Sequence, residues 1–133
     1  MKADYKIIFG SSKLPSTVDV DMEDGDFNRV PGKGHTIQAM CGKDNNIWWI
    51  IGEKMPRTFT ENEIPRFNPN EIKVQLQPYM DSHVSRGLTV RTLLEHTNLY
   101  HEVALEEYSS DVWTWDRFVC LGDSMDKVAP QVR

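Results

Sequence analysis

The chain has 133 residues, of which 39% are hydrophobic and 26% charged, so length and composition predict one soluble globular domain over residues 1–133. Its 20 acidic and 15 basic side chains give a net charge of −5, which argues against a nucleic-acid partner, because such a protein needs a basic surface. No apolar run approaches the roughly 18 residues that cross a bilayer, and the first five residues contain no signal-peptide core. Cys41 and Cys120 lie in apolar runs and are expected to be small buried side chains. We therefore expect an intracellular, cytoplasmic protein without membrane insertion.

Five or six mostly antiparallel strands are predicted in chain order, at residues 5–9, 27–30, 35–41, 47–53, 99–108 and 113–122. The third and fourth runs are joined by Gly42-Lys43-Asp44-Asn45-Asn46, which is typical hairpin chemistry. In the fourth run both alternating faces are apolar, with Ile47, Trp49 and Ile51 on one and Trp48 and Ile50 on the other. Because a strand with one solvated face alternates with polar residues, something must cover both sides of this sheet.

Two helices are predicted between the strands. Asn68-Pro69-Asn70-Glu71 combines an N-cap, a proline at the first helical position and a glutamate two positions later, and Pro78 predicts a kink or an early end. Thr89 is the predicted N-cap of a second helix that stops near Asn98. Two helices can cover only one sheet face. The predicted fold class is therefore α+β, a mostly antiparallel sheet with two helices on one face.

Several chemical motifs were tested and do not fit. The acidic block that begins at Asp19 places Asp24 where a calcium loop needs glycine and Val30 where it needs a bidentate glutamate. His96 and His101 have no zinc-site spacing, and no metal is expected. A group of proton-transfer side chains lies close together in sequence, namely Glu95, His96, His101, Glu102, Glu106, Glu107 and Tyr108. Most should be solvated surface groups, and the functional alternative is that Glu106 or His101 faces a pocket as acid or base.

The segment Arg117-Phe118-Val119-Cys120-Leu121-Gly122-Asp123-Ser124 resembles the second flavin-binding motif of class A FAD-dependent monooxygenases, in particular the fungal enzymes of indole-diterpene and meroterpenoid biosynthesis. Further matching segments occur in the family's order and spacing, namely Ile7-Ile8-Phe9-Gly10, Gly42-Lys43-Asp44 with Trp48-Trp49, Glu53-Lys54, Arg57-Thr58-Phe59, Ile64-Pro65-Arg66-Phe67 and Leu105-Glu106-Glu107. The resemblance implies a substrate-binding domain whose uncovered sheet face covers the active site in the family.

The same resemblance implies that the Gly-x-Gly-x-x-Gly segment for FAD is missing, so that the chain is expected to be truncated and to lack its cofactor domain. Residues 122–130 would be a remnant of the second flavin motif, in which the family's histidine position holds Asp126 and its threonine position Ala129. Of Gly122 and Asp123, only Asp123 would touch FAD, through the ribose. We therefore expect no bound cofactor.

Three functional hypotheses follow. The first is a cofactor-independent cyclase or isomerase that acts by acid/base catalysis on a hydrophobic terpenoid or meroterpenoid intermediate of secondary metabolism. The second is a non-catalytic ligand-binding or partner subunit that completes a separate flavin-binding chain. The third, a decayed fragment, is weakened by the coherent caps, turns and core pattern. The substrate and the reaction type are left open.

The candidate catalytic residues are Glu106 first, then His101, with Asp116 and Tyr108 as further acids or bases. The candidate substrate-binding residues are large and apolar, namely Met40, Trp49, Trp113 and Trp115. An apolar sheet face without its flavin domain would be exposed to water, which monomers seldom tolerate over a large patch. We therefore expect a homodimer through the open face that carries Trp48 or Trp49, or an apolar ligand that covers this face.

Overall fold

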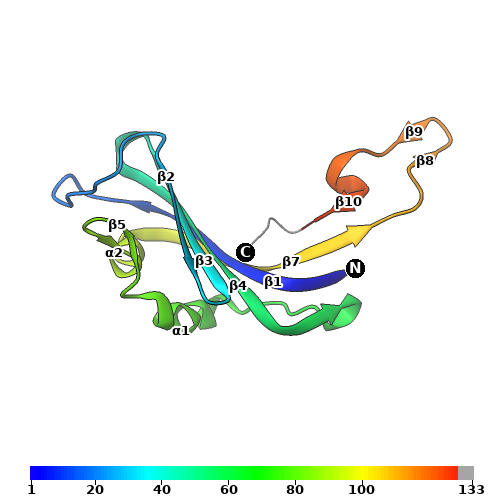
Figure 1. Ribbon diagram of the computed structural model, residues 1–133, viewed down its shortest axis with the longest axis horizontal. Helices are drawn as coiled ribbons and strands as arrows, with labels where there is room; N and C mark the ends of the chain where they lie inside the picture. The colour runs from blue at the N-terminus through cyan, green and yellow to red at the C-terminus, as the bar shows by residue number, and fades with distance from the viewer. Residues whose placement is uncertain (129–133) are drawn as a thin grey trace.

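The computed structural model describes residues 1–128, and its central feature is a curled six-stranded antiparallel sheet (Figure 1). The strand order is β10-β7-β1-β4-β3-β2, formed by β1 (Lys2–Lys13), β2 (Phe27–Gly32), β3 (His35–Gly42), β4 (Asn46–Thr60), β7 (Thr97–Ser109) and β10 (Asp126–Lys127). Two small hairpins stand outside it, β5 (His83–Ser85) with β6 (Leu88–Thr89), and β8 (Thr114–Trp115) with β9 (Phe118–Val119). The predicted fold class, α+β with mostly antiparallel sheet, is confirmed.

The hairpin β3–β4 forms where turn chemistry predicts it. Asp44 and Asn45 adopt left-handed conformations, with φ of 59° and 58°, which Asp and Asn tolerate better than other residues that carry a Cβ atom. The turn sets the register in which Cys41 lies opposite Ile47 and Ala39 opposite Trp49. Since cross-strand partners share a face, the two strands present one continuous buried surface.

Two short helices cover one face of the sheet (Figure 1). Helix α1 (Ile72–Leu76) lies between single 3₁₀ turns at 69–71 and 77–79; Asn68 caps the first turn by accepting from the Asn70 amide, and Pro78 stands in the second. Helix α2 (Val90–Glu95) begins after Thr89, whose hydroxyl accepts from the Thr92 amide, so this predicted cap is confirmed.

The core lies between these helices and the sheet. Ile8, Ile37, Trp49 and Ile51 point from β1, β3 and β4 toward Leu76 and Leu93 of the helices, and all six side chains are at most 2% exposed. The indole Nε1 of Trp49 donates to Ser12 Oγ at 2.9 Å, which in turn donates to the carbonyl of Leu93 at 2.8 Å. This chain of hydrogen bonds ties the sheet to α2.

Several features differ from the sequence-based expectation. Residues 113–122 do not form one strand: Asp116, with φ of 51°, turns the chain back and makes the hairpin β8–β9. The hairpin β5–β6 was not predicted, because its strands are only three and two residues long. Cys41 is buried as expected, but Cys120 is exposed at the end of β9, and both thiols are free. Within residues 1–128, none of the helices has the length and apolar character that crossing a membrane requires.

Candidate functional site

The sheet face opposite α1 and α2 carries large apolar side chains in contact with solvent. We call this surface the open face; its exposed apolar members, 38–63% accessible, are Phe27, Met40, Trp48, Ile50, Leu99 and Val103. One cross-strand row runs Phe27–Met40–Trp48–Ser11–Leu99, from β2 to β7. Because residues opposite one another in neighbouring strands lie on the same face, this row crosses five strands without a charged side chain.

His101 lies in the neighbouring row, Arg29–Gln38–Ile50–Phe9–His101. Its ring centroid lies 5.7 Å from that of Phe9, with the planes tilted by 37°, and the imidazole is exposed to solvent. The structure therefore brings His101 and Met40 onto one surface.

Glu106, the first candidate acid or base, lies farther along β7, beside a hollow of about 470 Å³. Its Oε1 is 3.2 Å from Arg66 Nη1, without the geometry of a hydrogen bond, and its side chain is 20% exposed. The hollow is lined by Pro65, Arg66, Phe67, residues 102–106 and Lys127. Glu106 is therefore held by a cation at the edge of the sheet, away from the row that contains His101.

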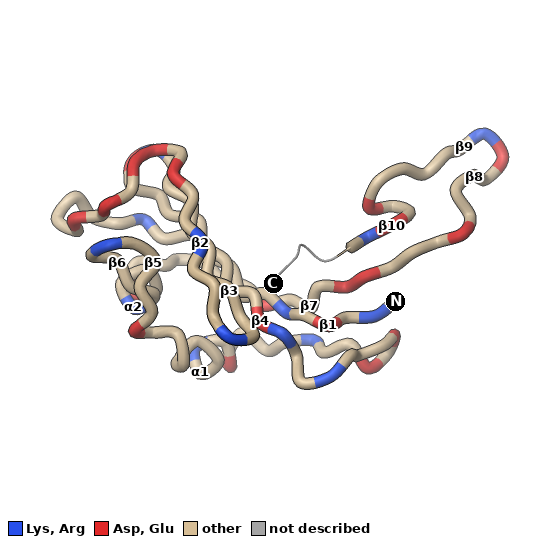
Figure 2. Tube along the Cα trace, in the orientation of Figure 1, with Lys and Arg blue, Asp and Glu red and all other residues tan. Residues whose placement is uncertain are grey.

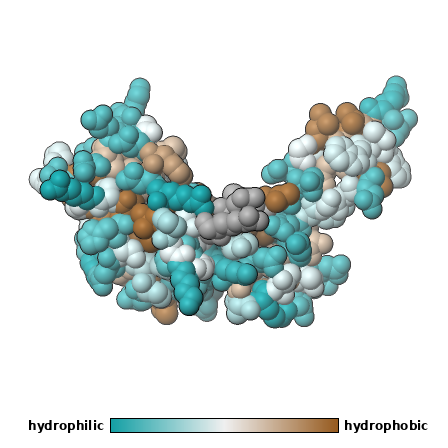
Figure 3. Space-filling model, in the orientation of Figure 1, coloured by the Kyte–Doolittle hydropathy of each residue, from teal (hydrophilic) through white to brown (hydrophobic). Residues whose placement is uncertain are grey.

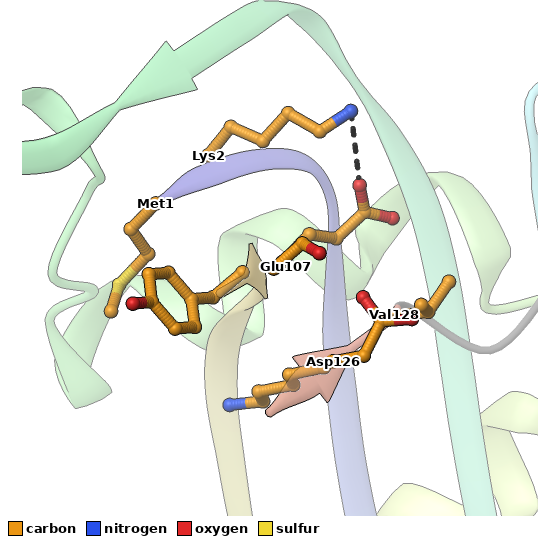
Figure 4. A pocket seen from close by; sticks show the side chains of 8 residues that line it. Met1, Lys2, Glu107, Asp126 and Val128 are labelled. Atoms are coloured by element: carbon orange, nitrogen blue, oxygen red, sulfur yellow. Dashed lines mark ion pairs between the residues drawn. The ribbon is translucent and has the colours of Figure 1, made fainter. Parts of the chain in front are cut away.

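Tyr108 lies at the end of β7, beside a second hollow of about 380 Å³ where the chain's first residues meet β10. Figure 4 shows this hollow, in which Lys2 Nζ pairs with Glu107 Oε2 at 3.1 Å and Asp126 and Val128 lie on the opposite side. The Glu107 carboxylate is the first cause, and Asp4 a further one, of a raised pKa for Lys2. Figure 2 shows the acidic residues along this part of β7.

The candidate substrate-binding tryptophans do not lie together. Trp49 is 2% exposed and points into the core on the helix-covered face, so Trp48 is the tryptophan of the open face. Trp113, Trp115 and Asp116 belong to the hairpin β8–β9, which stands away from the sheet at the far end of the molecule from α2 (Figure 1). Sequence alternation could not reveal which face of β4 is covered, since both faces are apolar.

A charged cluster that sequence reasoning missed lies on the covered face. Lys6 Nζ is 2.9 Å from Glu102 Oε1 and 3.4 Å from Glu53 Oε2, and it donates to Gln75 of α1. The Glu102 side chain is fully buried, and its second oxygen, Oε2, has no hydrogen-bond partner. Strand alternation could have revealed this cluster, because Lys6 is two residues before Ile8 and therefore points to the same, covered face.

Tyr79 completes the polar part of the covered face. Burial, first, and then the neighbouring Glu53 carboxylate raise the pKa of the Tyr79 phenol to about 12. The ring packs on His35 with centroids 5.0 Å apart. This cluster sits beneath the sheet and fixes α1 to it, so its role is structural.

The segment that resembles the second flavin motif is a turn exposed to solvent. Gly122, Asp123 and Ser124 make one exposed 3₁₀ turn, and a Cβ atom added to Gly122 would meet nothing within 4 Å. A flavin nucleotide is normally held by backbone amides at a helix N-terminus with close packing of glycine. Within residues 1–128, no group of three or more His, Cys, Asp or Glu side chains is placed to hold a metal ion.

Comparison with known proteins aligns nearly the whole chain with one part of longer proteins. No protein-family model matches it, and no solved structure does. The FAD-dependent monooxygenase spyC of Aspergillus fumigatus is 29% identical over 130 residues, which are 98% of this chain and 26% of the relative. The FAD-dependent monooxygenase verC1 of Penicillium polonicum is 34% identical over 133 residues, 99% of this chain and 16% of the relative.

A third relative, the FAD-dependent monooxygenase trt8 of Aspergillus terreus, is 31% identical over 130 residues, 97% of this chain and 32% of the relative. The chain therefore spans about a third or less of the length of the curated relatives it matches.

Proposed function

We propose, from the relationship of this chain to a segment of the fungal FAD-dependent monooxygenases, that its open face binds a hydrophobic terpenoid or meroterpenoid intermediate of secondary metabolism. The family resemblance itself, predicted from the sequence motifs, is confirmed by these relatives. The observation that carries the proposal is the uncharged row Phe27–Met40–Trp48–Ser11–Leu99, which offers an apolar ligand a continuous surface. Each apolar side chain that the ligand shields from water contributes about 1.5–3 kcal/mol when fully buried.

Ligand binding is tested with the isoprenoid alcohol geranylgeraniol as probe, by its quenching of tryptophan fluorescence. Met40→Glu places a charge in the middle of the row and should raise the dissociation constant at least tenfold. The matched control is Val74→Glu, because Val74 is 71% exposed on α1, away from the open face. Equal affinities of both variants and the wild type would refute the assignment of the ligand to the open face.

The chemistry that we propose on this surface is cyclisation or isomerisation without a cofactor. For an epoxide substrate, an acid protonates the epoxide oxygen as a C–O bond breaks, an alkene electron pair forms the new C–C bond, and a base removes a proton from carbon. His101 supports this proposal best, because it shares the open face with the bound ligand, and Glu106 is the second candidate acid or base.

The test of the chemistry uses a synthetic prenylated aromatic epoxide and product analysis by mass spectrometry. Replacing a general acid or base lowers the rate about 100- to 10,000-fold, so His101→Ala should lose turnover while it retains binding. Glu106→Gln, assayed in parallel, separates the two candidates.

The second candidate function is a non-catalytic ligand-binding or partner subunit for a flavin-bearing chain. It is supported by the exposure of the open face, since an extended apolar surface also suits a protein partner. Binding of geranylgeraniol with no turnover of the epoxide by the wild type would favour this function over the enzyme.

A further inference from the structure

A second large apolar surface lies on the hairpin β8–β9 with its flanking residues 112–121, which we call the arm. Its apolar side chains are 54–79% exposed, namely Val112, Trp113, Trp115, Phe118, Val119 and Leu121. Figure 3 shows the arm standing off the body, with hydrophobic residues near its end. A two-stranded hairpin with strands of two residues is marginal in water unless it packs on another surface.

The arm and the open face are therefore suited to pack against each other. Each is apolar and exposed, and the arm projects away from the sheet of its own chain (Figure 1). The row on the open face carries no charge, so apolar rings laid on it would bury no unpaired ion. The charges of the arm, Asp116 and Arg117, lie at the turn between its strands, where they stay at the rim of a docked surface.

We propose that two copies of this chain exchange arms, each arm packing on the open face of the other copy. Trp113 and Trp115 then complete, in trans, the apolar site whose other wall contains Met40 and Trp48 of the partner subunit. The involvement of a ligand rests on the proposed function; the exchange of arms does not. Reciprocal exchange makes a closed two-fold dimer, whereas a one-way contact would continue into a filament.

The available area suits a stable dimer. Aromatic side chains bury about 150–250 Å² each, so the three rings of one arm supply on the order of 450–750 Å². Each copy contributes one arm and one open face, and a standard interface needs about 800 Å² per partner. The occupant is therefore a second copy, because it covers both surfaces at once.

The first experiment is complementation in trans, measured by light scattering and sedimentation. The arm variant Trp115→Ser/Phe118→Ser and the face variant Met40→Glu/Trp48→Ser should each dimerise at least about 100-fold more weakly than the wild type. Their 1:1 mixture should dimerise more strongly than either variant alone, because one of its two contacts pairs the intact arm of the face variant with the intact face of the arm variant. Wild-type monomer at tens of micromolar, or a dimer that is insensitive to the arm variant, would overturn the proposal.

The second experiment locates the arm directly, with Cys120 of the arm as the probe. Introducing Met40→Cys on the open face should give a covalent dimer on mild oxidation, and Cys120→Ser should abolish it. The control Val74→Cys, on α1, should give no comparable cross-link, and an exclusively intrachain product would also refute exchange. If exchange fails while geranylgeraniol still binds with the Met40 dependence described above, the proposed function stands alone.

Discussion

Lys6 is the charged residue on which the covered face of the sheet depends. It stands in an apolar strand, its side chain is 12% exposed, and its ammonium group neutralises the fully buried Glu102 and the partly exposed Glu53. A buried carboxylate without its cation is expensive, so removal of one partner costs more than the pair contributes. The ion pair is therefore a point where one substitution loosens α1 from the sheet.

Lys6→Met should lower the free energy of unfolding by about 3–5 kcal/mol, because the buried Glu102 would lose the cation that it pairs with. The measurement is urea denaturation followed by tryptophan fluorescence. Lys2→Met is the matched control: Lys2 is 54% exposed and pairs with Glu107, so its loss should stay below about 1 kcal/mol. Equal effects of the two substitutions would contradict this account.

Tyr79 should make the stability of the fold depend on alkaline pH. Its pKa is about 12 in the folded chain, against about 10 in an unfolded one, so the folded state holds the phenolic proton more tightly. This stabilisation is complete below about pH 10 and is lost as the pH rises from about 10 to 12. Tyr79→Phe should weaken that part of the decline in unfolding free energy, whereas Tyr108→Phe, at a 44% exposed position, should not.

At the scale of elements, local sequence signals predicted turns and helix caps correctly, but they did not predict which surfaces are covered. Turn residues and caps located the β3–β4 hairpin and α2, because these depend on a few neighbouring side chains. The arm was mistaken for one strand, since the reversal at Asp116 has no glycine or proline to mark it. Trp48 and Trp49 could not be assigned to faces, because coverage of a sheet is a property of distant helices.

The central strand β1 gives an element-scale prediction at Gly10. A Cβ atom there would lie 2.5 Å from Trp49 Cζ2 and 3.0 Å from the carbonyl oxygen of Leu99, so Gly10→Ala must displace the indole that binds Ser12. Overpacking of this kind costs about 1–3 kcal/mol of unfolding free energy. Gly42→Ala is the control, because its nearest contact would be 3.4 Å away. Near-ultraviolet circular dichroism and urea unfolding should distinguish the Gly10→Ala variant from the Gly42→Ala control. A Gly10→Ala variant with the spectrum and unfolding free energy of the wild type would contradict the tight contact.

At the scale of the whole molecule, family resemblance and site geometry carry different information. The segments that match the monooxygenases predicted the relatives, and the alternation of apolar residues with the hairpin turn predicted the antiparallel sheet. They did not predict that His101 and Met40 share an exposed surface while Glu106 is held by Arg66 at the sheet edge. His101 and Glu106 are five residues apart in β7, so alternation places them on opposite faces, but which of these faces is open depends on where the helices pack.

The flavin nucleotide supplies the last prediction. Gly122–Ser124 form one exposed turn of three residues, and neither a longer helix N-terminus nor a close backbone approach is present at this turn to hold a pyrophosphate. Protein of this sequence, incubated with excess FAD and desalted, should therefore show no absorbance band near about 450 nm, where an oxidised flavin absorbs. Asp123→Asn, which removes the carboxylate that the family resemblance assigns to the FAD ribose, should leave that spectrum unchanged. A yellow preparation with one flavin per chain, whose absorbance band is lost in the Asp123→Asn variant, would contradict this prediction.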